Sequence, residues 1–142
     1  LMPNHFHFLL KQIKDNGILN FMRLLNNSYS RYFNIKYHRK GSLFEGRFKA
    51  IRTETNEQLL HLSRYIHLNP YSSFIVRDLK NLLIYPFSSL QEYLGNAQNT
   101  ICDKKIVLGQ FKTSKAYRKF VFDQADYQRN LQIIKHQLLE KS

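Results

Sequence analysis

Two histidines near the beginning of the chain, in His5-Phe6-His7, have a spacing that suits metal binding. Side chains of a β-strand alternate between its two faces, so both imidazoles would project from one face. Phe6, Phe8 and Leu10 would then point the other way, into a core. Imidazole is the commonest protein ligand for a metal ion, so the pair is half of a metal site. The simpler alternative is a strand that carries two solvated histidines.

Tyr65 and Asn69 supply two further groups that suit phosphate chemistry. They lie four residues apart and therefore share one face of a helix. Two imidazoles and an amide oxygen can hold a hard divalent ion and leave positions for phosphate oxygens. Such an ion acts as a Lewis acid on the phosphate. The Tyr65 hydroxyl is then a candidate nucleophile that forms a covalent phosphotyrosine.

Each of these roles has an alternative. Tyr65 is either the nucleophile, which the surrounding residues favour, or a half-buried helix tyrosine. Asn69 is either a ligand or the C-cap of its helix before Pro70, a role that asparagine fills well. His61, one turn before Tyr65, either assists it or is a surface histidine. A tyrosine is protonated at neutral pH, so activation must come from the metal, a nearby base or a basic neighbour such as Lys49.

The elements that must position these groups can be read from the pattern of apolar residues. Residues 5–12 are expected to form a strand, and residues 17–34 an amphipathic helix whose apolar stripe is core. Residues 42–52 alternate apolar and charged side chains, which predicts another strand with a bend or bulge at Gly46.

The second half of the chain is expected to be helical. Thr55 and Gln58 form a capping box that begins a helix with Leu59, Leu62 and Ile66 buried. This helix should end near Asn69, because the residue before a proline disfavours helical geometry. A turn at 85–89 begins a short helix, and helices are expected at 103–109 and at 113–139, the latter interrupted near 123–126.

Charge is the strongest compositional signal. The 142 residues carry a formal net charge of +12, which favours a polyanionic partner such as nucleic acid. No apolar run approaches the ~20 residues of a membrane span, and no basic amphipathic helix indicates a membrane surface. Cys102 is the only cysteine, which excludes an internal disulfide and a cysteine-based zinc cluster. A cytoplasmic, nucleoid-associated protein fits these features best.

The positive charge is concentrated between residues 22 and 52, where eight Lys and Arg residues face a single carboxylate, Glu45. A charge run is commonly a solvated face, and Arg47 has the option of pairing with Glu45. Cations on one face near a catalytic site would instead bind phosphates, and this interpretation is preferred. The candidate DNA-binding residues are Arg39, Lys40, Arg47, Lys49 and Arg52.

Four separated motifs resemble one protein family. His5-Phe6-His7 is similar to the HUH motif, in which a hydrophobic residue separates two metal-binding histidines. Residues 64–70 (RYIHLNP), 46–49 (GRFK) and 85–89 (YPFSS) resemble the REP-associated tyrosine transposases, which belong to the single-tyrosine HUH transposases. The resemblance runs from residue 2 to about residue 90, and residues 100–142 resemble the helical tail of some members.

The resemblance implies a ferredoxin-like α+β fold, with the histidines on a central antiparallel strand and the tyrosine on a helix packed nearby. Residues 1–98 would be the carboxy-terminal portion of a catalytic domain, and residues 99–142 a helical tail. Family members have further strands and a helix before the HUH strand. An amino-terminal portion is therefore expected to be missing from this sequence.

The resemblance also implies an activity, namely cleavage and transfer of single-stranded DNA beside hairpin-forming repeats. Tyr65 would attack the scissile phosphate to give a 5′-phosphotyrosine and a free 3′-hydroxyl, while His5, His7 and Asn69 would hold Mg²⁺ or Mn²⁺. The partner would be single-stranded or hairpin DNA, and a monomer is favoured over a dimer. The alternative is a remnant that binds nucleic acid without catalysis. A phosphohydrolase is disfavoured, because no carboxylate cluster accompanies the histidines.

Overall fold

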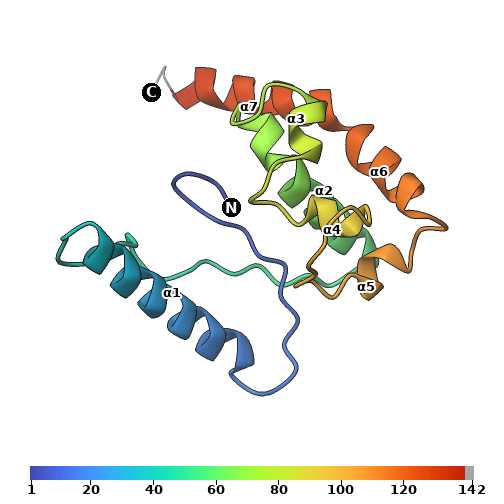
Figure 1. Cartoon of the computed structure of the whole chain (residues 1–142). Helices are drawn as coiled ribbons and strands as arrows, with labels where there is room; N and C mark the ends of the chain where they lie inside the picture. The colour runs from blue at the N-terminus through green and yellow to red at the C-terminus, as the bar shows by residue number, and fades with distance from the viewer. Residues whose placement is uncertain (140–142) are drawn as a thin grey trace. The chain divides into compact units, whose positions relative to one another are not determined.

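The computed structural model describes residues 1–139, with side chains described as far as residue 134. Its elements are all helices (Figure 1): α1 (Gly17–Lys36), α2 (Asn56–Ser72), α3 (Leu79–Leu83), α4 (Leu90–Tyr93), α5 (Lys105–Leu108), α6 (Ser114–Phe122) and α7 (Ala125–Leu139). The chain forms two compact units. The first, here the helical unit, comprises residues 1–8 and 53–142, and the second, here the basic unit, comprises residues 9–52.

The predicted ferredoxin-like antiparallel sheet is wrong, because residues 1–139 contain no strand. Residues 5–12 and 42–52, the two predicted strands, have irregular backbone instead. Alternation of apolar and polar side chains is typical of a strand with two different faces. The backbone N–H and C=O groups of a strand also need a neighbouring strand as hydrogen-bond partner. Two isolated strands are marginal even when they pair with each other, and three or more are needed for a stable sheet.

The helical unit is built around α2. Helices α3, α5, α6 and α7 all pack on it, and α7 makes the most extensive contact. The core contains fully buried side chains from these helices and from α4, the largest being Tyr117, Leu68, Leu82, Leu90 and Val121. Arg129 of α7 lies 4.2 Å from the ring centre of Tyr71 on α2, and the Tyr71 hydroxyl donates a 2.9 Å hydrogen bond to Asp126. The helix that carries Tyr65 is therefore held by the carboxy-terminal helices.

The predicted start of α2 is confirmed. Thr55 is the N-cap, and its hydroxyl accepts a hydrogen bond from the backbone N–H of Gln58. The Gln58 side chain accepts from the backbone N–H of Glu54, one residue further back than in a standard capping box. Two backbone donors that the helix cannot satisfy itself are thereby paired.

Replacing Thr55 with alanine is expected to lower the free energy of unfolding by about 1 kcal/mol, because the N–H of Gln58 loses its acceptor. Urea unfolding followed by circular dichroism measures the change. Thr53→Ala, two residues before the helix cap, is the matched control. Equal effects of the two substitutions would contradict a capping role for Thr55.

The predicted end of α2 near Asn69 is wrong, since the helix continues through Pro70 to Ser72 and its C-cap is Ser73. Pro70 cannot donate its own intrahelical hydrogen bond, which normally disfavours the interior of a helix. Residues 67–72 are all buried, and Tyr71 belongs to the core. Burial of this last turn offsets the local cost of the proline.

The buried face of α2 also differs from the predicted one. Leu62 and Ile66 are only partly buried, whereas Ser63 and His67 are 3% and 2% exposed. The helix is therefore turned so that a polar pair, together with Leu68, faces the core. This pair takes part in a hydrogen-bond network that the apolar pattern did not reveal.

The helices predicted after residue 85 are confirmed, whereas α3 was not predicted from the sequence. The turn at 85–89 leads into α4, whose N-cap is Ser89. The helix expected at 103–109 is α5, and the interrupted helix expected at 113–139 is the pair α6 and α7. No helix in residues 1–139 combines the length and the apolar character that crossing a membrane requires.

The basic unit contains α1 and the segments on either side of it. The predicted helix at 17–34 is confirmed and extends to Lys36. Its apolar stripe was expected to be core, but only Met22 is buried, and Phe21 and Tyr32 are 45% and 56% exposed. The amphipathic pattern therefore identified the helix correctly, whereas the burial expected for its apolar face was wrong.

Candidate active site around His5, His7 and Tyr65

The segment that carries the histidines is anchored by the motif at 85–89. The backbone nitrogen of Leu1 donates a 2.6 Å hydrogen bond to the carbonyl of Phe87, and the Tyr85 hydroxyl donates a 3.0 Å bond to the carbonyl of Leu1. The N–H of Met2 donates to the carbonyl of His5, which closes a turn. Two motifs that are far apart in the sequence thus lie side by side in the helical unit.

The structure brings the histidine pair and the tyrosine together. The rings of His5 and His7 lie 5.0 Å apart, centre to centre, and the ring of His7 lies 5.5 Å from that of Tyr65, with edge-to-face geometry in both cases. Tyr65 is 44% exposed on α2, so the residue is accessible from solvent. The expected juxtaposition of imidazoles and phenol is therefore present, although no strand carries the histidines.

The alternation expected at residues 5–8 survives in part without a strand. Phe6 and Phe8 form their own ring contact at 5.0 Å, separate from the histidine pair. Phe8 and Leu10 are 42% and 39% exposed, however, so the prediction that they point into a core is wrong. Residues 1–139 form no sheet, so no second strand layer covers the side chains of Phe8 and Leu10.

The surroundings of His7 favour a neutral imidazole with a nitrogen lone pair available. Burial lowers the pKa of His7, and the neighbouring His5 lowers it further. The Nε2 atom of His7 is buried and has no hydrogen-bond partner among the described residues. Nδ1 of His5 lies 2.7 Å from the Asn4 side-chain oxygen and donates to it, so this hydrogen bond does not involve Nε2.

Asn69 lies inside α2 and is 4% exposed. Its side-chain oxygen accepts a 3.1 Å hydrogen bond from Ser73, and its backbone carbonyl accepts from the N–H of Ser73. Since Ser73 is the C-cap, the structure does not give Asn69 the cap role. An amide oxygen has a second lone pair, so one acceptor position remains for a ligand.

A divalent metal ion fits the two histidines. The orphaned Nε2 of His7 is the kind of buried polar atom that needs a partner, and His5 offers a nitrogen donor beside it. No three His, Cys, Asp or Glu side chains converge in the part of the chain that the structure describes. A third protein ligand would therefore be of another type, and Asn69 as that ligand stays a prediction.

His61 is occupied elsewhere. Its Nδ1 accepts a 2.7 Å hydrogen bond from Arg64, and its Nε2 lies 3.8 Å from Glu57. Arg64 in turn stacks on the ring of Phe120 in α6 at 4.4 Å. These contacts favour the surface-histidine interpretation of His61 over a role beside Tyr65.

A buried polar network lies on the opposite side of α2 from Tyr65. Nδ1 of His67 is 2.7 Å from the Tyr117 hydroxyl, and Nε2 of His67 is 2.9 Å from the Ser89 hydroxyl. The Tyr117 hydroxyl also bonds to Ser63. The network joins α2, α6 and the 85–89 segment that anchors Leu1. Its one sequence signal was a polar pair, Ser63 and His67, spaced one helical turn apart.

Acid is expected to destabilise the helical unit through His67. Burial lowers its pKa from 6.5 to about 4, so the unfolded chain takes up a proton first as the pH falls. The contribution of neutral His67 to the free energy of unfolding is fully present above pH 6.5. It declines as the pH falls toward 4, by on the order of 3 kcal/mol in total. Urea unfolding at several pH values measures the decline. His67→Gln should flatten it and His61→Gln should leave it unchanged, whereas identical profiles for both variants would contradict this role.

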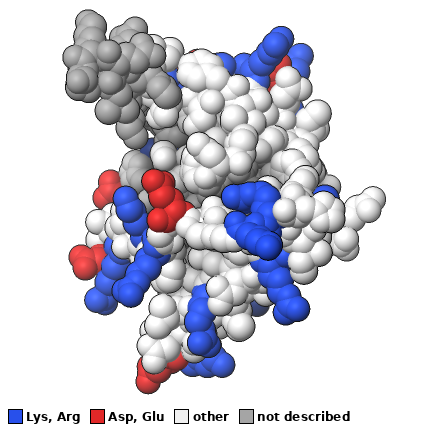
Figure 2. Space-filling view, turned by 90° about the vertical axis from the view of Figure 1, so that its left-hand side faces the viewer, with Lys and Arg blue, Asp and Glu red and all other residues white. Residues whose placement is uncertain are grey.

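The five predicted DNA-binding residues all lie in the basic unit and are exposed: Arg39, Lys40, Arg47, Lys49 and Arg52. Among the described residues the only ion pair is that of His61 with Glu57, so Arg47 does not pair with Glu45. Residues 9–52 contain ten Lys and Arg and two carboxylates. Lys and Arg side chains are also spread more widely than Asp and Glu over the face shown in Figure 2.

One comparison with known proteins gives a match. Residues 1–69 match the family model described as transposase IS200 like. The matched range contains the histidine pair, the basic unit and α2 as far as Asn69, and hence every predicted site residue. It supports the transposase family and a DNA-processing function for this part of the chain. No curated protein and no solved structure matches the chain.

Proposed function

We propose that the protein is a REP-associated tyrosine transposase that cleaves and rejoins single-stranded DNA beside hairpin-forming repeats, with Tyr65 as the nucleophile. The observation that carries the proposal is the packing of the His7 ring against Tyr65, with the ring of His5 also in contact with His7. The match of residues 1–69 to IS200-like transposases and the charge of the basic unit support it.

In this reaction the Tyr65 oxygen attacks the scissile phosphorus and forms a new O–P bond. The bond from phosphorus to the 3′-oxygen of the preceding nucleotide breaks, and that oxygen takes up a proton to become a free 3′-hydroxyl. Attack by a 3′-hydroxyl on the phosphotyrosine reverses the step and joins DNA. One phosphodiester is exchanged for another, so no ATP is consumed.

Each residue of the site has a part in this scheme. His5 and His7, with Asn69 as the third ligand, would hold Mg²⁺ or Mn²⁺, which supplies Lewis-acid stabilisation of phosphate charge when bound. Burial keeps His7 neutral, the form in which imidazole binds a cation. Tyr65 is exposed, so a DNA strand would approach it from solvent. Arg39, Lys40, Arg47, Lys49 and Arg52 would contact the phosphates of the DNA, and the protein would act as a monomer.

The test is incubation of the protein with a hairpin-bearing single-stranded oligonucleotide and Mn²⁺, followed by denaturing electrophoresis. A 3′-end label should move with the protein, because the 5′-phosphotyrosine stays on the 3′ fragment, whereas a 5′-end label should appear on a shorter free strand. EDTA should abolish both products. The reverse distribution of labels would contradict the proposed polarity.

A second candidate function is binding of nucleic acid without cleavage. The charge of the basic unit favours it independently, since ten cations against two carboxylates bind a polyanion with or without a catalytic site. Salt-sensitive binding without any covalent product, in a protein shown to be folded, would select this function over the first.

A further inference from the structure

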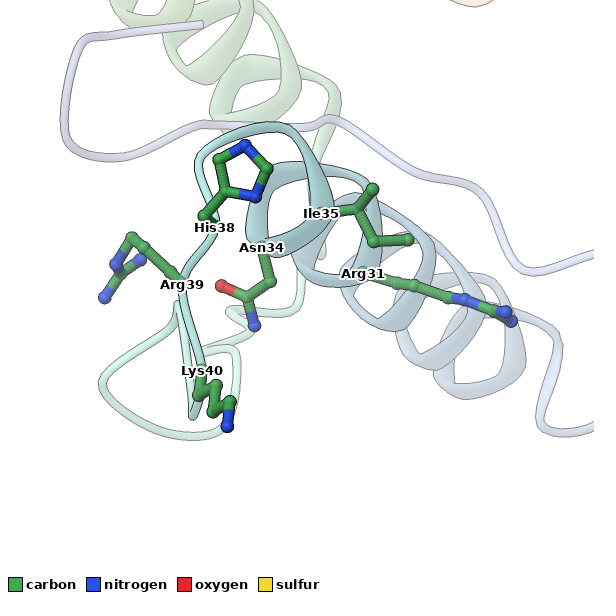
Figure 3. Close-up of a pocket in the computed structure, with 6 residues that line it drawn as sticks. All are labelled: Arg31, Asn34, Ile35, His38, Arg39 and Lys40. Carbon is green, nitrogen blue, oxygen red and sulfur yellow. The ribbon is translucent and has the colours of Figure 1, made fainter.

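An open pocket of about 630 Å³ lies in the basic unit at the carboxy-terminal end of α1. Figure 3 shows the side chains that line it along the last turns of the helix and the loop that follows. They are Arg31, Asn34, Ile35, His38, Arg39 and Lys40.

Hydrogen bonds at the end of α1 pair carbonyl groups that would otherwise disfavour an anion in the pocket. The end of a helix normally presents unpaired carbonyls and a partial negative charge, which repels anions. Here the N–H of His38 donates to the carbonyl of Ile35, and the N–H of Arg39 donates to the carbonyl of Asn34 at 2.9 Å. The Asn34 side chain also donates to the carbonyl of Gly41 at 2.9 Å. These bonds fold the loop back onto the helix and pair the carbonyls of Asn34 and Ile35, two of the last four in α1.

The cations of the pocket are not neutralised by the described residues. Arg31, Arg39 and Lys40 are exposed and form no ion pair within the described part of the chain. Neither Asp15 nor Glu45, the carboxylates of the basic unit, lines the pocket. Three permanent positive charges around one concave site repel one another until an anion is placed between them.

Asn34 provides a further indication that the pocket binds a ligand through its arginines. Its side-chain oxygen is buried without a hydrogen-bond partner among the described residues. A guanidinium has five N–H donors, so an arginine that donates to this oxygen keeps donors for an anion as well. A bound anion would hold the guanidinium in place and thereby satisfy an acceptor that is otherwise left unpaired.

We infer that this pocket binds a backbone phosphate of single-stranded DNA. Arg31 and His38 thereby join Arg39 and Lys40 as phosphate contacts, and Arg39, which also lies 5.7 Å from the ring of Phe33, is held in place by its own stacking. The choice of DNA as the polymer rests on the proposed function, whereas the anion site itself rests on the pocket.

The inference is tested with Arg31→Gln and Lys40→Gln in the full chain, with Lys14→Gln as the matched control. Lys14 belongs to the same unit but lies before α1 and outside this pocket. Affinity for a fluorescent single-stranded oligonucleotide is measured at several salt concentrations. Removal of one phosphate interaction should reduce the slope of log affinity against log salt by about 0.7. The control should retain the slope of the unmodified protein, and circular dichroism shows whether α1 is intact.

Slopes for Arg31→Gln and Lys40→Gln equal to that of Lys14→Gln would overturn the inference, even if Tyr65 still forms its adduct. Reduced slopes without any adduct would instead uphold the pocket and contradict the proposed transposase. Inorganic phosphate is compared with chloride at equal ionic strength as a competitor. Stronger competition by phosphate against the unmodified protein than against Lys40→Gln would show that DNA and phosphate share the pocket, and would support the inference. Phosphate binding that Lys40→Gln weakens, together with unchanged slopes for DNA, would assign the site to free phosphate and overturn the assignment to a DNA strand.

Discussion

Replacing Tyr65 with phenylalanine is expected to abolish the covalent DNA adduct and to lower the rate of strand cleavage by about 10³-fold or more. The change removes one oxygen, the atom that forms the bond to phosphorus, and loss of a covalent nucleophile has effects of at least this size. Denaturing electrophoresis with a 3′-end-labelled hairpin oligonucleotide measures both quantities. A persistent adduct in Tyr65→Phe would exclude this tyrosine as the nucleophile.

The structure supplies controls for this experiment. Tyr65 is 44% exposed, so loss of its hydroxyl should change the free energy of unfolding by less than about 0.5 kcal/mol. Tyr127, on α7 in the same unit, is 61% exposed and serves as the matched substitution. Tyr127→Phe should retain adduct formation. Unchanged DNA affinity in Tyr65→Phe would show that the substitution removes chemistry and not binding.

Replacing Tyr117 with alanine is expected to lower the free energy of unfolding of the helical unit by about 3–5 kcal/mol, a cost typical of removing a large aromatic side chain from a core. The ring is fully buried and contacts Tyr93 at 5.3 Å and Phe111 at 5.2 Å. Burial also raises the pKa of Tyr93 to about 12, so this aromatic cluster stays uncharged at physiological pH. Urea unfolding gives the free-energy difference.

Tyr117→Phe separates the hydroxyl from the ring. It keeps most of the packing but leaves Ser63 and Nδ1 of His67 without their shared partner, at a cost of about 1–3 kcal/mol. The phenylalanine variant should therefore lie between the unmodified protein and Tyr117→Ala. Equal destabilisation in the two variants would mean that the hydroxyl network, and not the ring, accounts for the stability.

The helices were predictable because their signals are local. Thr55 and Gln58 marked the start of α2, and the interruption near Asp123 separated α6 from α7, since caps and apolar periodicity act within a few residues. The sheet was not predictable in this way. Residues 5–12 alternate as a strand does, but a strand also needs a partner that no local pattern can supply.

The candidate site was predicted in part. The proximity of His7 to Tyr65 followed from the resemblance to a family and not from any spacing, since the two residues lie in separate elements. The burial of His67 was missed because a histidine on an inner face looks polar until its partners, Tyr117 and Ser89, are known. Pro70 was misjudged because burial of a helix end, a tertiary effect, outweighed a local preference.

The contacts of residues 1–8 determine the fraction of molecules in which the candidate site is assembled. This segment contacts the rest of the helical unit through the backbone of Leu1 and the ring of His7, and residues 1–8 form no sheet ladder. Segments fastened in this way open at a lower free energy than the core that α2 shares with α6 and α7. The histidine pair would then face Tyr65 in only a fraction of molecules, and affinity for a ligand of the assembled site is reduced by that fraction. A DNA strand that contacts both the histidines and Tyr65 would select the assembled molecules, so substrate binding and completion of the site would be one thermodynamic event.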